Sequence, residues 1–202
     1  KKLRYLGCFS NGISESSEFF ESGYPFLTYS DIYKNYSLPI PSGVCLSSQS
    51  DWEKYSVKYG DIFFTRTSED KNDIGISSVC LKTIEKCCFS GFLVRFRPND
   101  NRLNPQFSKF YFRSSIPLTH FAKEMNIVTR ASLAQPLLKT TPILIPPEEE
   151  QEDIANFLEF KVNTIDQICE AEQKRIDKLY EYRQSLISSV ITDNINLEDE
   201  LL

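Results

Sequence analysis

The fold is decided by residues 145–162, which read IPPEEEQEDIANFLEFKV. The paired prolines Pro146 and Pro147 oppose any helix behind them, and the three glutamates that follow place negative charge on a first helical turn, where the helix dipole favours it. From there to residue 202 the sequence contains neither Gly nor Pro. We therefore predict one long helix over residues 148–192, which at 1.5 Å per residue would measure about 65 Å.

Apolar residues recur along this helix at heptad spacing. They form two interleaved lines in which eight of ten positions are apolar, and Glu172 and Arg183 are the two exceptions. A seam sustained over more than four repeats indicates a coiled coil, because the seam needs a second helix to cover it. The residues expected at this dimer or partner interface are Leu158, Val162, Ile165, Cys169, Ile176, Leu179, Arg183, Leu186 and Val190.

The residues before the helix differ from it in charge and in pattern. Residues 1–147 hold 18 Lys and Arg against 13 Asp and Glu, a net charge of +5, whereas residues 148–202 hold 5 against 15, a net charge of −10. Short apolar runs predict strands, and helices are expected from Asn104-Pro105 and near residues 118–125. The predicted strands cover residues 61–65, 77–84, 92–96 and 141–147. We expect an α+β fold with three parts: a globular domain at 1–147, the long helix at 148–192 and an acidic tail at 193–202.

Several kinds of function find no support in the sequence. The six cysteines form no C-x-x-C pair and His120 is the only histidine, so we expect no metal site and reduced, buried thiols. A cysteine hydrolase using His120 is disfavoured because no nucleophile motif surrounds any cysteine. The sequence lacks a methyltransferase N-P-P-Y motif, a Walker loop and a nuclease grouping, so we expect a non-enzyme. No apolar run reaches the roughly 18 residues of a membrane span, and we expect a cytoplasmic location.

Four segments carry a resemblance when they are taken in order along the chain. They are residues 23–32 (GYPFLTYSDI), 59–66 (YGDIFFTR) with Ile74-Gly75 after it, 145–158 (IPPEEEQEDIANFL) and 183–192 (RQSLISSVIT). Together they resemble the DNA-specificity subunit of type I restriction–modification systems. The resemblance implies a target recognition domain followed by the conserved helix of that family. One of each matches either a half-size subunit or one half of a longer chain.

The resemblance also implies function and partners. Such a subunit is non-catalytic and directs methyltransferase subunits, with or without a restriction subunit, to a bipartite target in double-stranded DNA. It would hold no cofactor, and S-adenosylmethionine is expected on the partner methyltransferase subunits. A half-size subunit would pair with a second copy through the long helix, so two identical heads would read an interrupted palindrome.

Within the expected recognition domain, polar and basic loop residues are the candidates for DNA contact, because bases are read by Arg, amide and hydroxyl groups. We favour Arg66 and Arg130, and we leave open whether Arg95 and Arg97 reach DNA or form the outer face of a strand. The expected DNA-binding residues are Tyr29, Ser30, Thr65, Arg66, Thr67, Ser68, Lys71, Asn126, Thr129, Arg130, Ser132 and Gln135.

One alternative remains from the sequence. A coiled-coil adaptor whose head binds protein or carbohydrate would carry the same acidic helix and the same seam. The two hypotheses differ in salt dependence, since each phosphate contact lowers log K by about 0.9 per unit of log salt.

Overall fold

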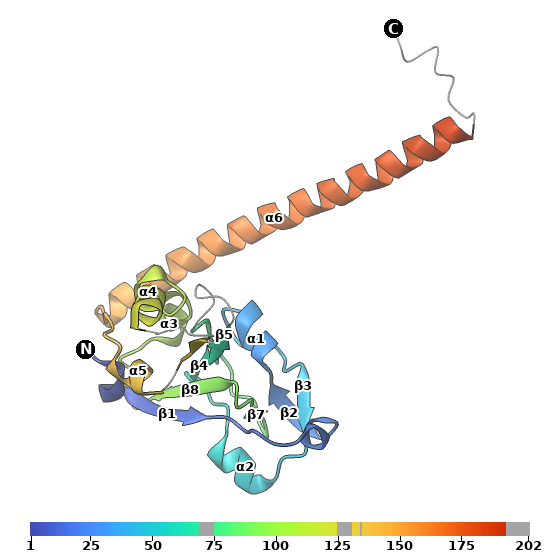
Figure 1. The fold of residues 1–202 in the computed structure, drawn as a ribbon. Helices are drawn as coiled ribbons and strands as arrows, with labels where there is room; N and C mark the ends of the chain where they lie inside the picture. The colour runs from blue at the N-terminus through green and yellow to red at the C-terminus, as the bar shows by residue number, and fades with distance from the viewer. Residues whose placement is uncertain (69–74, 125–130, 134, 193–202) are drawn as a thin grey trace. The chain divides into compact units, whose positions relative to one another are not determined.

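The computed structural model describes residues 1–68, 75–124, 131–133 and 135–192, and it divides into two compact units (Figure 1). The first unit is Lys1–Ala155 and the second begins at Asn156, so about two turns of the long helix belong to the globular unit. The predicted α+β fold followed by one long helix is confirmed. The elements are η1 (Leu3–Tyr5), β1 (Gly7–Asn11), η2 (Ser17–Phe20), β2 (Tyr24–Leu27), α1 (Tyr29–Lys34), β3 (Gly43–Cys45), α2 (Gln49–Lys54), β4 (Ile62–Thr65), β5 (Thr67–Ser68), β6 (Ser77–Val79), β7 (Cys88–Phe89), β8 (Leu93–Pro98), α3 (Pro105–Tyr111), α4 (Ser115–Glu124), β9 (Ala131–Ser132), α5 (Gln135–Thr140) and α6 (Glu148–Ile191).

Three sheets organise the globular unit. The largest has the strand order β1-β8-β4-β6, with every neighbouring pair antiparallel. The second has the order β3-β2-β7, in which β2 pairs antiparallel with β3 and parallel with β7. The third is a short ladder between β5 and β9. Strands far apart in sequence therefore meet at the centre of the unit.

Strand β4 is buried on both of its faces. Ile62 and Phe64 pack into one core cluster, which helices α3 to α6 also line, whereas Phe63 packs into a second cluster with residues from β2 and α1. Successive side chains of a strand point to opposite faces, so a strand covered on both sides needs apolar residues at every position. This explains why the run after Asp61 is continuously apolar instead of alternating.

The predicted start of α3 is confirmed. The side chain of Asn104 accepts hydrogen bonds from the backbone N–H groups of Gln106 at 2.8 Å and Phe107 at 3.4 Å, and Pro105 occupies the first helical position. These contacts satisfy N–H groups that have no partner within the helix. The helix expected near residues 118–125 begins earlier, at Ser115.

Helix α6 begins at Glu148, as predicted, and is tied to the globular unit by Gln151. The Gln151 side chain is 2% exposed and makes three hydrogen bonds to the backbone. Its Oε1 accepts from the N–H of Asn104 at 2.9 Å, and its Nε2 donates to the carbonyls of Arg102 at 2.9 Å and Pro146 at 3.0 Å. Four residues later, Ala155 is buried in the main core. One face of the first two turns is therefore fixed by packing.

Two predicted strands are wrong in extent or in kind. The strand predicted over residues 77–84 ends at Val79, and Ile84 forms only an isolated bridge with Val57. The segment 141–147 is no strand, and its one ladder contact is a bridge between Pro142 and Lys2. Three of its seven residues are prolines, which lack the N–H that a ladder requires.

Several short elements were missed by the sequence analysis. Helices α1 and α2 lie in the section expected to hold only strands and loops, and strands β1, β2 and β3 and helix α5 were not predicted. Thr28 and Ser48 begin the two helices with capping boxes, each closed by an aspartate three residues later. That spacing, T-x-x-D and S-x-x-D, is the signal that could have located both helices.

The cysteines correct a further expectation. Four of them are buried, but Cys8 and Cys169 are exposed, so the prediction of six buried thiols is wrong for these two. The neighbours Cys87 and Cys88 belong to different core clusters, which agrees with side chains on opposite faces of an extended segment. Burial raises the pKa of Cys80 to about 12, so this thiol stays protonated at neutral pH.

Candidate nucleic-acid interface

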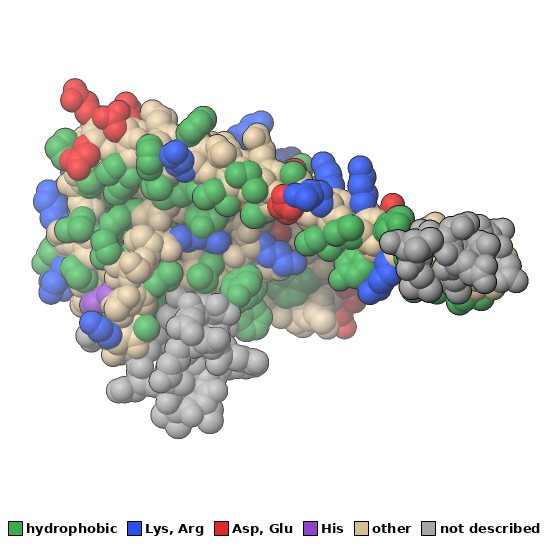
Figure 2. Space-filling view, turned by 90° about the horizontal axis from the view of Figure 1, so that it is seen from above, with side chains coloured by type: hydrophobic (Ala, Val, Ile, Leu, Met, Phe, Trp, Pro, Cys, Tyr) green, Lys and Arg blue, Asp and Glu red, His purple; other side chains and the backbone are tan. Residues whose placement is uncertain are grey.

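The basic side chains of the globular unit do not mark an interface by themselves. On the face drawn in Figure 2, the described Lys and Arg side chains are scattered among hydrophobic ones and do not gather in one patch. This distribution agrees with the modest excess of 18 Lys and Arg over 13 Asp and Glu in residues 1–147. The interface must therefore be located from the predicted DNA-binding residues and their geometry.

Two of the predicted segments meet in the structure. Strand β5 follows β4 directly, and it pairs antiparallel with β9, so that Thr67 lies opposite Ser132 and Ser68 lies opposite Ala131. The sequence placed these residues in two separate loops that lie more than sixty positions apart. This strand pairing places the backbones of the two predicted segments side by side.

Arg66 is fixed between β4 and this ladder. Its N–H donates to the carbonyl of Phe92 at 2.9 Å, and its carbonyl accepts from the N–H of Leu133 at 2.6 Å. Its Nη1 donates to the carbonyl of Gly91 at the long distance of 3.5 Å, which is the one side-chain hydrogen bond that the described residues give it. A guanidinium has five N–H donors, so most of those of Arg66 have no partner among the described residues. Arg66 thus combines a rigid backbone with an available cation.

Tyr29 and Ser30 form the first turn of α1. Ser30 is exposed, and the half-buried Tyr29 ring stacks on Tyr33 with centroids 5.9 Å apart. Tyr29 also lines a cavity of about 440 Å³ together with Phe92. The carbonyl of Phe92 accepts the backbone N–H of Arg66. The cavity therefore lies between the predicted residue Tyr29 and the turn that holds the backbone of Arg66.

Gln135 begins α5, where it is half-buried. Its Nε2 donates to Oδ1 of Asn11 at 2.9 Å, and Asn11 is the exposed last residue of β1. The remaining hydrogen-bonding capacity of both amides is available to a ligand. Sequence reasoning missed Asn11 because no motif distinguishes it from other polar residues.

The predicted DNA-binding role of Thr65 is wrong, and four other predicted residues lie outside the described part of the chain. Thr65 was expected to contact DNA, but it is the last residue of β4, within the predicted strand 61–65, and it is fully buried. Its N–H donates to the carbonyl of Ile76 at 2.8 Å, which extends the strand pairing by one residue and turns the side chain inward. Thr65 therefore cannot contact DNA. Outside the described residues lie Lys71, Asn126, Thr129 and Arg130.

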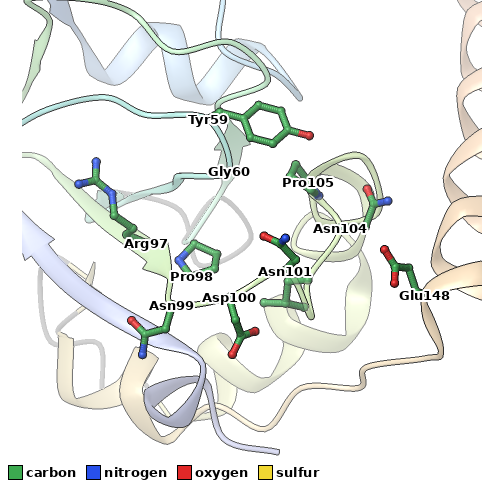
Figure 3. Close-up of a pocket in the computed structure, with 11 residues that line it drawn as sticks. Tyr59, Gly60, Arg97, Pro98, Asn99, Asp100, Asn101, Asn104, Pro105 and Glu148 are labelled. Atoms are coloured by element: carbon green, nitrogen blue, oxygen red, sulfur yellow. The ribbon is translucent and has the colours of Figure 1, made fainter.

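A polar pocket of about 350 Å³ lies elsewhere in the globular unit, between the end of β8, the start of α3 and the start of α6 (Figure 3). Its lining includes Arg97, whose guanidinium points away from the acidic lining residues, together with Asp100, Glu148 and several asparagines. The two carboxylates would repel a phosphate. This pocket is therefore a poor match for a DNA backbone.

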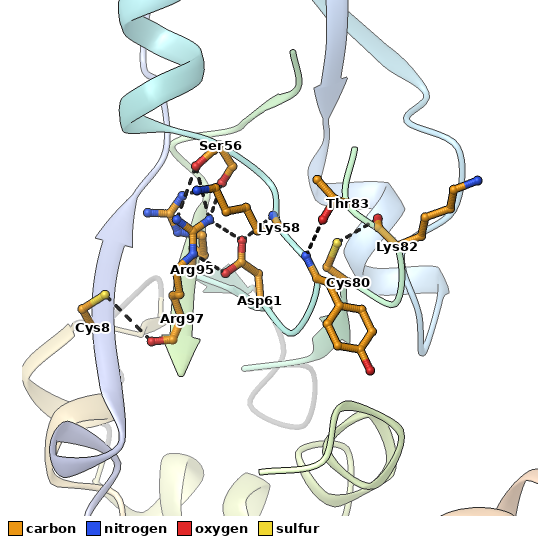
Figure 4. Close-up of polar contacts among 10 residues, drawn as sticks. Cys8, Ser56, Lys58, Asp61, Cys80, Lys82, Thr83, Arg95 and Arg97 are labelled. Carbon is orange, nitrogen blue, oxygen red and sulfur yellow. Dashed lines mark hydrogen bonds and ion pairs between the residues drawn. The ribbon is translucent and has the colours of Figure 1, made fainter. Parts of the chain in front are cut away.

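Arg95 and Arg97 belong to the interior of the protein, which decides the alternative left open by the sequence (Figure 4). Arg97 makes a bidentate ion pair with the fully buried Asp61, with Nε to Oδ1 at 2.6 Å and Nη2 to Oδ2 at 2.7 Å. These bonds raise the pKa of Arg97, whereas burial lowers the pKa of Arg95. Both arginines also donate to the carbonyl of Ser56. Their role is structural.

The seam predicted on the long helix consists of exposed or partly exposed residues. Leu179 is 66% exposed, Ile165 is 57% exposed and Ile176 is 44% exposed, and Cys169 and Arg183 are exposed as well. The partly exposed members are Leu158, Val162, Leu186 and Val190. Sequence reasoning missed exposed aromatic side chains beside the seam, namely Phe157, Phe160, Tyr180 and Tyr182.

The described residues contain no cluster of His, Cys, Asp or Glu that could hold a metal ion. No described helix is long and apolar enough to cross a membrane. His120 lies half-buried on α4, and its Nε2 is buried without a hydrogen-bond partner among the described residues.

Comparison with known proteins identifies the family. The profile of the type I restriction modification DNA specificity domain matches residues 10–180, which is most of the chain and includes both the globular unit and much of α6. The chain belongs to this family. The family is one of specificity domains and not of catalytic domains, in agreement with the non-catalytic role expected from the sequence.

Relatives of the specificity-domain family support this assignment. A chain named as the specificity subunit of type I restriction enzyme MjaX, from Methanocaldococcus jannaschii, is 27% identical over 150 residues, covering 73% of this chain and 34% of the relative. This chain therefore spans about a third of the length of that relative.

Solved structures share the fold. A chain from a study of complex assembly and conformational transition of the type I R-M system has a TM-score of 0.68 at 20% identity, covering 93% of this chain and 44% of that one. The crystal structure of the HsdS subunit from Thermoanaerobacter tengcongensis has a TM-score of 0.59 at 18% identity, covering 84% and 38%. At these identities the likeness concerns the fold alone.

Proposed function

We propose that this chain is the sequence-specific DNA-recognition subunit of a type I restriction–modification complex. In this proposal the globular unit reads one half of a bipartite target in double-stranded DNA, inside the cytoplasm, and α6 recruits the other chains. The observation that carries the proposal is the family match over residues 10–180, because it extends across the globular unit and into the long helix. The chain spans less than half the length of these relatives, so its activity and its partners are proposals that need their own experiment.

The DNA-reading face that we propose is centred on Arg66 and the β5–β9 ladder. Arg66 has most of its donors available, and its backbone is held on both sides by hydrogen bonds. A guanidinium is the side chain best suited to bidentate recognition of guanine in the major groove. Ser30 and the amides of Gln135 and Asn11 supply further donors and acceptors on exposed or half-buried positions. These are the group types that base reading requires.

The proposed role of α6 is to pair with helices of other chains. Its apolar side chains at positions such as Ile165 and Leu179 are mostly exposed, which is costly in water and favours association. We propose that the seam pairs two copies of this chain when it acts as a half-size subunit and that the paired helices dock methyltransferase subunits, which carry S-adenosylmethionine. Two identical heads would then read an interrupted palindrome.

The experiment is methylation mapping with the assembled complex. The chain is combined with the methyltransferase subunits of the same organism's type I system, S-adenosylmethionine is added, and methylated positions in genomic DNA are read with and without the chain. We expect methylation at one bipartite motif that depends on the chain. Methylation without any sequence preference, or duplex binding that does not weaken as salt rises, would contradict the proposal and favour a protein- or carbohydrate-binding adaptor.

Variants of Arg66 test the proposed face directly. Arg66→Ala should relax the preference at one base pair of each half-site and cost about 1–3 kcal/mol of discrimination. Arg66→Lys keeps the charge but loses the bidentate geometry, so it should restore affinity more than specificity. Arg4→Ala removes the same charge from the exposed η1 segment and serves as the matched control. An unchanged motif with Arg66→Ala would exclude this residue from base reading.

A further inference from the structure

An apolar cavity of about 440 Å³ adjoins the proposed DNA-reading face. The deepest of its apolar lining residues, Ile13 and Phe26, are each 6% exposed. The apolar lining consists of Ile13, Phe20, Phe26, Tyr29, Val44 and Phe92. The cavity lies between α1, the β2–β3 pair and the turn between β7 and β8. Of these, α1 holds the predicted residues Tyr29 and Ser30, and the turn contacts Arg66.

Phe92 stands at the mouth of this cavity in a turn with a rigid backbone. The Phe92 carbonyl accepts the N–H of Arg66 at 2.9 Å, and its own N–H donates to Oγ of Ser90 at 3.2 Å. The preceding Gly91 donates to the carbonyl of Ile13 at 2.7 Å. Nevertheless, the Phe92 side chain is 61% exposed. The ring is therefore not part of the core, and together with Tyr29 and the exposed Val44 in the same lining it forms a contiguous apolar surface that a ligand can cover.

The charges around the cavity limit what it can bind. Among the described residues, Glu15 is the one charged residue in its lining, and none of the described Lys or Arg residues lines it. A carboxylate repels phosphate, so the cavity does not suit the DNA backbone. Immediately outside, however, the Arg66 guanidinium approaches the carbonyl of Gly91. The cavity therefore suits an uncharged apolar group, provided that this group lies next to a hydrogen-bond acceptor that the Arg66 guanidinium can bind.

The major groove of DNA presents one apolar group, the 5-methyl group of thymine. We propose that Phe92, together with the apolar cavity behind it, contacts the 5-methyl group of a thymine next to the base pair read by Arg66. Phe92 is then a specificity-determining residue that distinguishes thymine from cytosine through apolar contact. This inference rests on the proposed DNA-reading function and adds a chemical preference to it.

The test uses synthetic duplexes that carry the mapped target. Each thymine of one half-site is replaced in turn by deoxyuridine, which differs only by the missing methyl group, and binding by the complex assembled with its methyltransferase subunits is measured. We expect one replacement to weaken binding about fourfold, the value for one buried methyl-sized group. With Phe92→Ala, the thymine and uracil duplexes should bind equally. Phe92→Leu should retain part of the difference.

A matched control separates this effect from a general loss of exposed aromatic surface. Tyr59 is 60% exposed and lines the polar pocket instead, so Tyr59→Ala should leave the thymine-to-uracil ratio unchanged. Three results would overturn the inference: a half-site without thymine, no replacement that weakens binding, or a thymine preference that survives Phe92→Ala. Loss of methyltransferase assembly in Phe92→Ala with an unchanged ratio would also overturn it and assign the cavity to a protein. Absence of any sequence-specific binding by the unaltered complex would instead refute the DNA-reading function.

Discussion

Removal of the Asp61 carboxylate should be among the most damaging single changes in the globular unit. Asp61 is fully buried, pairs with Arg97 through two hydrogen bonds of 2.6 and 2.7 Å and accepts the N–H of Lys58 at 2.7 Å. Loss of one partner from a buried ion pair costs about 3–5 kcal/mol, because the other charge stays desolvated. The Arg97 side chain is 25% exposed and partly reaches water, so we expect the lower end, about 3 kcal/mol, for Asp61→Ala. In a chain of this size that lowers Tm by about 6–12 °C.

A double-mutant cycle in urea measures this interaction. Unfolding is followed by the fluorescence of Trp52, the only tryptophan, which lies in α2 of the globular unit. Asp61→Ala leaves the Arg97 charge without its partner, and Arg97→Met removes that charge. The double variant should therefore be more stable, by about 2 kcal/mol, than the sum of the two single changes predicts. Asp100→Ala breaks an exposed ion pair with Arg102 and is the control, with an expected cost below about 1 kcal/mol. Additive single variants, or a cost of Asp61→Ala as small as the control, would refute the reasoning.

Three further outcomes are expected. Gln151→Ala should lower the free energy of unfolding by about 2 kcal/mol, because it leaves three partly buried backbone groups without their side-chain partner. Gln151→Glu should not restore stability, since a carboxylate cannot donate to two carbonyls, and full stability of either variant in urea would contradict this. Leu179→Asp combined with Leu186→Asp should convert dimers to monomers in light scattering while the unfolding midpoint of the globular unit is unchanged, and surviving dimers would show that the heptad assignment is wrong. Cys8 and Cys169 should react quickly with an aromatic disulfide reagent at neutral pH, whereas the four buried thiols should react only after unfolding; a third fast thiol would contradict the assigned burial.

The long helix and the centre of the sheet could be predicted because their signals lie within short stretches of sequence. Pro146-Pro147 followed by glutamates marks the start of α6, and the continuous apolar run in β4 marks a strand that is buried on both faces. The edge strands could not be found in this way. Strands β1 and β3 are stabilised by pairing with β8 and β2, which lie far away in sequence, so their own residues carry little pattern.

The candidate interface was predicted in part for the same reason. The residue types of the polar segments indicated a surface that contacts a ligand, but the pairing of β5 with β9 depends on long-range geometry. Thr65 was wrongly expected to contact a ligand because it is polar and adjoins the polar segment after the strand, whereas its side chain is buried. Phe92 was missed because the sequence analysis took it as the first residue of the apolar strand 92–96, whereas β8 begins at Leu93 and the Phe92 side chain is 61% exposed.

The β5–β9 ladder limits how this protein can be re-engineered. Arg66 is bonded through its backbone both to Phe92 and to Leu133, and Leu133 is anchored in the core directly after β9. Transplanting the segment around Arg66 from a relative, without its counterpart around Leu133, would sever those bonds and mismatch the ladder. Both segments therefore form one exchangeable cassette, and libraries aimed at new targets should vary them jointly.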